Sequence, residues 1–114
     1  MILERGSKLL VVHRRLFETD KARYFIGTVD DFDATIARVT GHSWTQNLLD
    51  GQFSRKEDER SKLVSLASDG LILYCLHPAV KLASLEFETT PQGRVYLSDG
   101  GTLRMDLTEN AAEK

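Results

Sequence analysis

Three aspartates, Asp30, Asp31 and Asp33, flank Phe32 in the stretch of the chain that most suggests chemistry. Closely spaced carboxylates are the ligands that hard cations such as Mg²⁺ and Ca²⁺ prefer. The glycine and the bidentate glutamate of a calcium-binding loop, however, are missing at the required spacing. Aspartate is also a preferred turn residue, because its side chain accepts hydrogen bonds from the backbone two residues on. The pattern therefore favours a structural turn over a metal site.

A second group of candidate residues begins after this turn and is suited to binding. His42 and Trp44 stand at the end of a β-rich run, where aromatic faces can stack on a base or grip a peptide. Arg38 precedes them, and Arg55 and Lys56 follow in a polar segment. These five residues form the candidate binding site. A core or rim position for the single tryptophan is the alternative interpretation.

Signatures of catalysis are scarce in this chain. The three histidines are scattered, and Cys75 has no second cysteine with which to complete a zinc site. The sequence contains neither a nucleophile elbow nor a glycine-rich phosphate loop. An enzyme that uses Asp30, Asp33 and His42 remains a third hypothesis, and it requires these groups to converge. We expect no catalytic residues, no metal and no cofactor.

Length and composition limit what surrounds these residues. The 114 residues fit a single domain, and 41% apolar and 28% charged residues are typical of a soluble globular protein. With a formal net charge of -2, the chain lacks a global field that would attract nucleic acid. The first apolar run, at residues 9–12, is too short for a signal peptide or a membrane span. We expect a cytoplasmic protein without membrane contact, in which Cys75 is a small buried side chain.

The apolar residues recur with period two or in short runs, which indicates an all-β chain. Strands are predicted at residues 8–17, 23–30, 34–40, 62–67, 71–76, 84–89, 94–98 and 102–107. Turn residues at 68–70, 90–93 and 99–101 separate the later strands and predict an antiparallel meander. The connection at residues 45–61 is predicted to be a solvated, mobile loop with a helical turn near residues 47–50. Residues 108–114 are expected to form a flexible tail.

The earlier and later predicted strands differ in how apolar and polar side chains alternate along them. Strands at 84–107 have one apolar and one polar face, whereas the earlier strands carry apolar residues on both faces. The earlier strands should therefore be covered on both sides. A barrel interior would cover one side, and the carboxy-terminal strands or another subunit would cover the other.

Residues 8–77 resemble the Sm-like family of small β-barrels in the order of their elements. That family's first motif is matched by Ile26, Gly27, Val29, Asp33 and Ile36, but Ala37 stands where the motif has asparagine. The second motif is matched loosely by residues 66–74, where Ala67 and Ser68 replace its arginine and glycine.

The resemblance implies a small antiparallel β-barrel, an Sm-like or SH3-like meander, with a carboxy-terminal β-strand extension at residues 84–107. It also implies assembly through exposed edge strands, and hence a homo-oligomer. The asparagine and the arginine-glycine pair line the family's uridine pocket, so their replacement weakens the case for base recognition. We therefore predict a non-catalytic interaction or assembly module; the sequence does not identify its partner, and a protein is favoured over a nucleic acid. RNA or single-stranded nucleic-acid binding through Arg38, His42 and Trp44 is the alternative.

Overall fold

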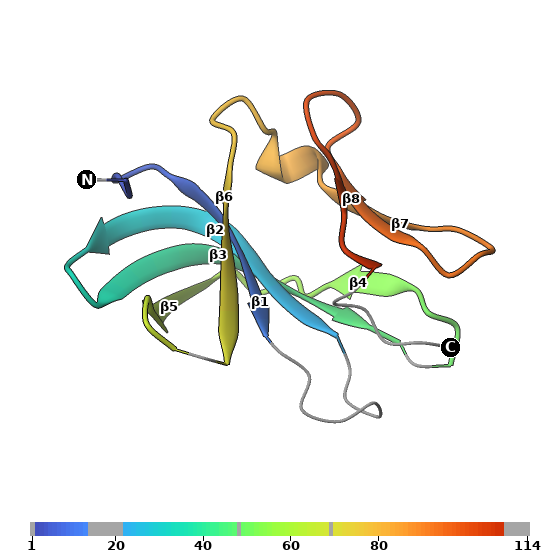
Figure 1. Ribbon diagram of the computed structural model, residues 1–114, viewed down its shortest axis with the longest axis horizontal. Helices are drawn as coiled ribbons and strands as arrows, with labels where there is room; N and C mark the ends of the chain where they lie inside the picture. Colours follow the sequence, from blue (N-terminus) through green and yellow to red (C-terminus); the bar gives the residue numbers. More distant parts are fainter. Residues whose placement is uncertain (1, 14–21, 48, 69, 109–114) are drawn as a thin grey trace.

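The computed structural model describes residues 2–13, 22–47, 49–68 and 70–108, which form two antiparallel sheets (Figure 1). The elements are β1 (Lys8–His13), β2 (Arg23–Phe32), β3 (Ile36–Gln46), β4 (Phe53–Arg55), β5 (Arg60–Ser65), β6 (Leu71–Leu76), the 3-10 helix η1 (Leu82–Ser84), β7 (Glu86–Thr89), β8 (Val95–Ser98) and β9 (Arg104–Asp106). The all-β prediction is confirmed. Within the described residues no helix is long and apolar enough to cross a membrane.

The larger sheet has the strand order β4-β3-β2-β1-β6, and β5 pairs with β3 along the same edge as β4. The smaller sheet is the meander β7-β8-β9, which confirms the predicted carboxy-terminal strands. No ladder joins β5 to β6 among the described strands. A closed barrel is therefore not found.

The long hairpin of β2 and β3 carries the irregularities of the larger sheet. A register shift between Val29 and Asp31 marks a β-bulge, which inserts an extra residue and bends the strand. Further along the ladder, Gly27 lies directly opposite Gly41. A Cβ atom on Gly41 would come within 2.0 Å of the Ile26 carbonyl oxygen. The two backbones thus approach too closely for a side chain at either position.

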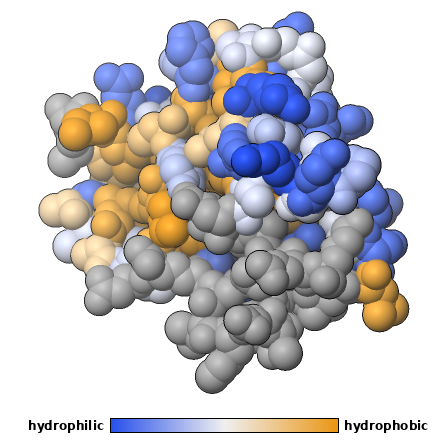
Figure 2. All heavy atoms as spheres, turned by 45° about the vertical axis from the view of Figure 1, so that its right-hand side comes forward, coloured by the Kyte–Doolittle hydropathy of each residue, from blue (hydrophilic) through white to orange (hydrophobic). Residues whose placement is uncertain are grey.

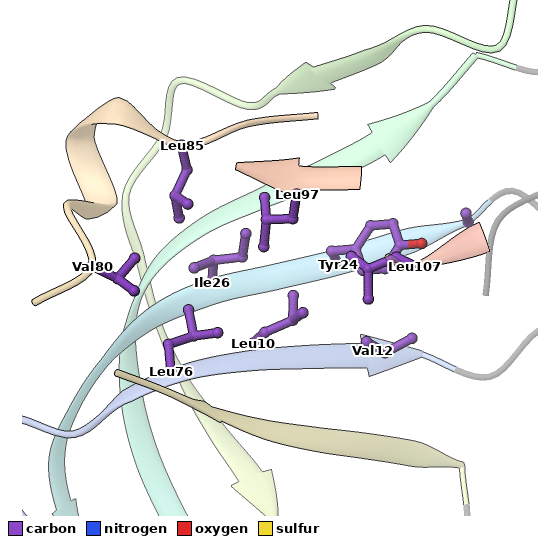
Figure 3. Close-up of a cluster of buried hydrophobic side chains, with 10 residues drawn as sticks. Leu10, Val12, Tyr24, Ile26, Leu76, Val80, Leu85, Leu97 and Leu107 are labelled. Atoms are coloured by element: carbon purple, nitrogen blue, oxygen red, sulfur yellow. The ribbon is translucent and has the colours of Figure 1, made fainter. Parts of the chain in front are cut away.

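Apolar side chains pack on both faces of the larger sheet. Between the two sheets lies the inter-sheet core, shown in Figure 3, whose buried members are Leu10, Val12, Ala22, Tyr24, Ile26, Leu76, Val80, Leu85, Leu97 and Leu107. The opposite face holds the inner core, whose buried members are Leu9, Val11, Phe25, Val29, Ala37, Val39 and Val64. Both outer strands supply the inner core, through Val64 of β5 and the partly buried Leu73 of β6, so the larger sheet curls around it. The prediction that the earlier strands are covered on both faces is confirmed.

Several predicted details need correction. Residues 53–55, expected in a mobile loop, form β4, which pairs with the end of β3. This strand is stabilised by hydrogen bonds to β3 rather than by an apolar pattern of its own, so the sequence did not indicate it. At the turn expected near residues 47–50, by contrast, a turn is found, which the Gly51 N–H closes by donating to the Asn47 carbonyl over 2.7 Å. Cys75 is exposed rather than buried, because β6 is an edge strand. The predicted strand segment 14–17 and tail residues 109–114 lie outside the described residues.

Asp99 ties the smaller sheet to the chain just before η1. Its carboxylate accepts hydrogen bonds from the backbone N–H groups of Leu103 at 2.9 Å and Gly101 at 3.0 Å. It also accepts one from the Lys81 N–H at 3.1 Å. These donors, of which Leu103 has the largest effect, lower the pKa of Asp99 from 3.8 to about 2.

We expect Asp99→Asn to lower the Tm at neutral pH and to flatten the acid side of the stability profile. A carboxyl group with a lowered folded-state pKa stabilises the fold above about pH 4, and that contribution is lost as the pH falls towards about 2. Thermal unfolding followed by circular dichroism across this range measures both effects. Asp58→Asn, which removes an exposed carboxylate, is the control. An identical pH profile in wild type and Asp99→Asn would contradict this role.

Candidate binding groove

A pocket beside β3 brings together candidate residues that are distant in the sequence. His42 and Trp44 of β3 and Arg55 of β4 line the same pocket, which has a volume of about 230 Å³. Leu82 and Leu85, at either end of the η1 turn, add apolar lining. Three of the five candidate binding residues therefore share one site, which we call the β3 groove.

Strand pairing explains why these side chains share the groove. Trp44 lies opposite Arg55 in the β3–β4 ladder, and His42 lies opposite Ile26 in the β2–β3 ladder. Because side chains alternate across a strand, His42 and Trp44 point to the same face. Ile26 belongs to the inter-sheet core, so this face is the one turned towards η1 and the smaller sheet. Figure 3 shows Leu85 directed towards Ile26 from the η1 segment.

Trp44 belongs both to the groove and to the packing beneath it. Its indole ring lies 5.1 Å from the Phe87 ring, which in turn is stacked on Phe53 at 4.4 Å and lies 4.9 Å from Tyr24. Aromatic pairs at such distances contribute about 0.5–1.5 kcal/mol each beyond apolar burial. The half-buried indole is thus fixed from one side by the smaller sheet. Both interpretations of Trp44, as a core side chain and as a site residue, describe part of its environment.

The remaining lining of the groove carries opposite charges. Arg55 and Glu59 are both exposed and line the pocket from β4 and the β4–β5 connection. Neither forms an ion pair with another residue that the structure describes. His42, half-buried, likewise makes no hydrogen bond through its imidazole to a described residue. The groove therefore offers a cation, an anion and an imidazole to a ligand.

Arg38 and Lys56 are not brought into the groove. The Arg38 guanidinium lies 3.9 Å from the Asp30 carboxylate, and Arg38 is four strand positions, or about 13 Å, from His42 along β3. Lys56 donates its backbone N–H to the Ser43 carbonyl over 2.8 Å, and its side chain is exposed. Lys56 follows Arg55 in the sequence but does not line the groove.

Of the three aspartates expected in the acidic turn, only Asp33 lies in the turn between β2 and β3, because β2 continues through Asp30 and Asp31 to Phe32. The Asp33 carboxylate accepts hydrogen bonds from the backbone N–H groups of Thr35 at 2.8 Å and Ile36 at 2.9 Å. These two bonds, in that order of effect, lower the pKa of Asp33. Asp33 thus closes the β2–β3 hairpin in the manner expected of a turn residue.

The two aspartates of the β-bulge are engaged by protein donors as well. The Asp31 carboxylate accepts a hydrogen bond from the Phe32 N–H at 2.9 Å and forms an ion pair with the Arg5 guanidinium at 3.1 Å. The bond from Phe32, followed by the contact with Arg5, lowers the pKa of Asp31. Asp30 accepts a short hydrogen bond from the Thr40 hydroxyl. Within the described residues no three His, Cys, Asp or Glu side chains gather to hold a metal ion.

The hypothesis of a catalytic site made from Asp30, Asp33 and His42 finds no support in this geometry. Asp33 bonds to Ile36, and six strand positions of about 3.3 Å each place His42 about 20 Å away along β3. That separation exceeds any span bridged by one water molecule. Asp30 is directed to Thr40, and no hydrogen bond joins it to His42 among the described residues.

Four residues that shape the groove were missed from the sequence. Glu59 was assigned to a solvated loop because charges of both signs alternate around it. Leu82 stands in a connection without periodicity, whereas Leu85 and Phe87 lie in the predicted strand 84–89, whose alternation shows only that they share its apolar face. These residues lie close to β3 because segments distant in the sequence pack together. Patterns within one segment do not predict such contacts.

Comparisons with known proteins leave this geometry as the basis for assigning a function. No family model matches the chain, and no curated protein or solved structure matches it significantly.

Proposed function

We propose that this chain is a non-catalytic binding module that holds an extended peptide segment of a protein partner in the β3 groove. One observation carries the proposal: His42, Trp44 and Arg55, which the sequence marks as binding residues, line one pocket together with Glu59. The scaffold is proposed to be an Sm-like barrel left open between β5 and β6. In support, the hairpin with the opposed glycines and the short β5–β6 connection follow the order of elements that suggests this family.

An extended peptide carries the groups that the groove leaves unpaired. Arg55 can donate to a carboxylate or carbonyl oxygen, and Glu59 can accept from a backbone N–H or an ammonium group. An apolar side chain can pack between Trp44 and Leu85. The volume of about 230 Å³ is below the range of about 300–1,000 Å³ typical of drug-sized ligands. It suits a single anchoring side chain on a longer segment.

Selection from a displayed library of random peptides, followed by calorimetric titration, tests this function. We expect selected peptides to bind about tenfold more weakly to His42→Ala and to Arg55→Ala, because each change removes a polar contact worth about 1.5 kcal/mol. Arg94→Ala, an exposed arginine of the smaller sheet, is the matched control and should bind as wild type does. Failure to select any peptide, or equal affinity for all variants, would contradict the proposal.

Single-stranded nucleic acid fits the groove less well than a peptide. Phe87 packs against one side of the Trp44 ring, which reduces the aromatic surface left for base stacking. Glu59 lines the groove together with Arg55. Its negative charge would repel the phosphate backbone of a nucleic acid. Oligouridylate binding that weakens with rising salt and is lost in Trp44→Ala would establish the nucleic-acid alternative instead.

We also propose that the chain forms a homo-oligomer through the edge strands of the larger sheet. Among the described strands, β5 pairs only with β3 and β6 only with β1. Next to the β5 edge, Leu63 is 73% exposed and Ile36 is 41% exposed. An unpaired edge beside exposed apolar side chains is a template for a second copy of the chain.

Leu63→Lys is expected to weaken self-association by about tenfold or more, because it places a charge on the proposed contact. Sedimentation velocity over a range of concentrations measures the shift. Leu49→Lys, which alters a still more exposed leucine in the turn before β4, is the control. A wild-type protein that stays monomeric at every concentration would exclude the assembly.

A further inference from the structure

Cationic side chains gather at one end of the inner core, on the sheet face opposite the β3 groove. His13, at the end of β1, lies opposite Arg23, at the start of β2. By strand alternation both belong to the face that carries Val11 and Phe25. Lys62 reaches this place from β5, where the alternation puts it on the same face as the buried Val64.

Lys62 extends along the concave face to reach this end. Its ladder partner is Val39, yet its ammonium group lies 3.5 Å from the Ser43 hydroxyl and 4.7 Å from the centre of the Phe25 ring. On this face Gly41 is the only residue of β3 between Val39 and Ser43, and it has no side chain to block the path. The close glycine pair therefore leaves room for the lysine.

No carboxylate from the described strands faces this group of cations. The residues that alternate onto the same face of β2, β3 and β6 around it are neutral: Phe25, Ser43, Thr45, Leu71 and Leu73. Arg60, the other cation on this face of β5, pairs with Asp58 at 3.7 Å. Partial burial, followed by the charges of Lys62 and Arg23, lowers the pKa of His13. Lys62 and Arg23 thus disfavour the protonated form of His13, and a bound anion would favour it.

We propose that Lys62, Arg23 and His13, with the Ser43 hydroxyl, form a binding site for a phosphoryl group of a small molecule. The arginine fork can bind two oxygens of the group, while the ammonium acts as a point charge and the hydroxyl as a further donor. A phosphoryl dianion offers three acceptor oxygens and matches several cations better than a single carboxylate does. This site is separate from the β3 groove and does not depend on peptide binding there.

Titration with inorganic phosphate at constant ionic strength, followed by NMR, tests the site in the full chain. We expect saturable shifts of the His13 ring and the Ser43 amide, and an increase in the His13 pKa, because a nearby anion favours the imidazolium. Lys62→Gln should weaken binding about tenfold, the loss of one charge-assisted hydrogen bond. Lys62→Arg should restore most of the affinity.

Lys81→Gln supplies the matched control, because it removes an equal charge from an exposed lysine beside η1. It should bind phosphate as wild type does. Shifts that do not saturate, an equal loss in Lys81→Gln, or full affinity in Lys62→Gln would each overturn the site. Oligouridylate that produces the shifts where phosphate does not would also overturn it, because the ligand would then be a nucleic acid rather than a small molecule.

Discussion

Gly41→Ala is expected to destabilise the protein by about 3 kcal/mol, the upper part of the range for overpacked sites. A Cβ atom at this position would lie 2.0 Å from the Ile26 carbonyl oxygen and 2.5 Å from the Gly27 Cα atom. Both contacts are with backbone, which cannot rotate aside as a flexible side chain can. Relief would require β2 and β3 to separate at the centre of the larger sheet. Gly27→Ala, with a Cβ atom 2.3 Å from the Thr40 carbonyl oxygen, should act similarly.

Urea unfolding followed by circular dichroism measures the loss. Gly101→Ala is the matched control, because nothing lies within 4 Å of a Cβ atom there, and its stability should change by less than about 0.5 kcal/mol. If Gly41→Ala unfolds at the same urea concentration as wild type, the two strands do not approach as described.

Phe87→Ala should cost about 3 kcal/mol, because it removes the ring that joins the two sheets beneath the groove. Phe87 contacts Tyr24, Trp44 and Phe53, all of which lie on the larger sheet or its β4 extension. Without it, the smaller sheet loses its aromatic contact with β3, and the Trp44 indole gains water. We therefore expect a red shift of the tryptophan emission together with the loss of stability.

Phe87→Leu provides the control for this prediction, because it keeps most of the apolar volume and should cost less than about 1.5 kcal/mol. Tryptophan emission and urea unfolding are measured on the same samples. Equal stability of the alanine and leucine variants would show that Phe87 does not join the sheets.

Alternation and turn residues were enough to predict most strands of this fold. β1, β2, β6 and the smaller sheet follow from patterns within each segment, because each has at least one continuously apolar face. β4 could not be predicted, since its three residues are polar or half-exposed and depend on pairing with β3. Cys75 was placed wrongly for a related reason: an apolar run does not reveal that its strand lies at the edge of the sheet.

The sequence predicted which residues of β3 belong to the candidate site, but not which residues of other segments join them. His42 and Trp44 share a face by simple alternation along β3, so their proximity follows from the sequence. Arg55 joins them through the β3–β4 ladder, whereas Arg38, on the same strand face, lies too far along β3 to line the groove. Glu59 depends on a connection between strands, where sequence pattern carries little geometric information.

The emission of Trp44 tests peptide binding in the β3 groove most directly, because the chain contains a single tryptophan and this residue lines the groove. A selected peptide should shift the emission to shorter wavelength and reduce iodide quenching, with the same midpoint as calorimetry, since the bound segment excludes water from the indole. If calorimetry detects binding while the emission and quenching of Trp44 stay unchanged at saturation, the peptide binds elsewhere and the proposed groove is not the binding site.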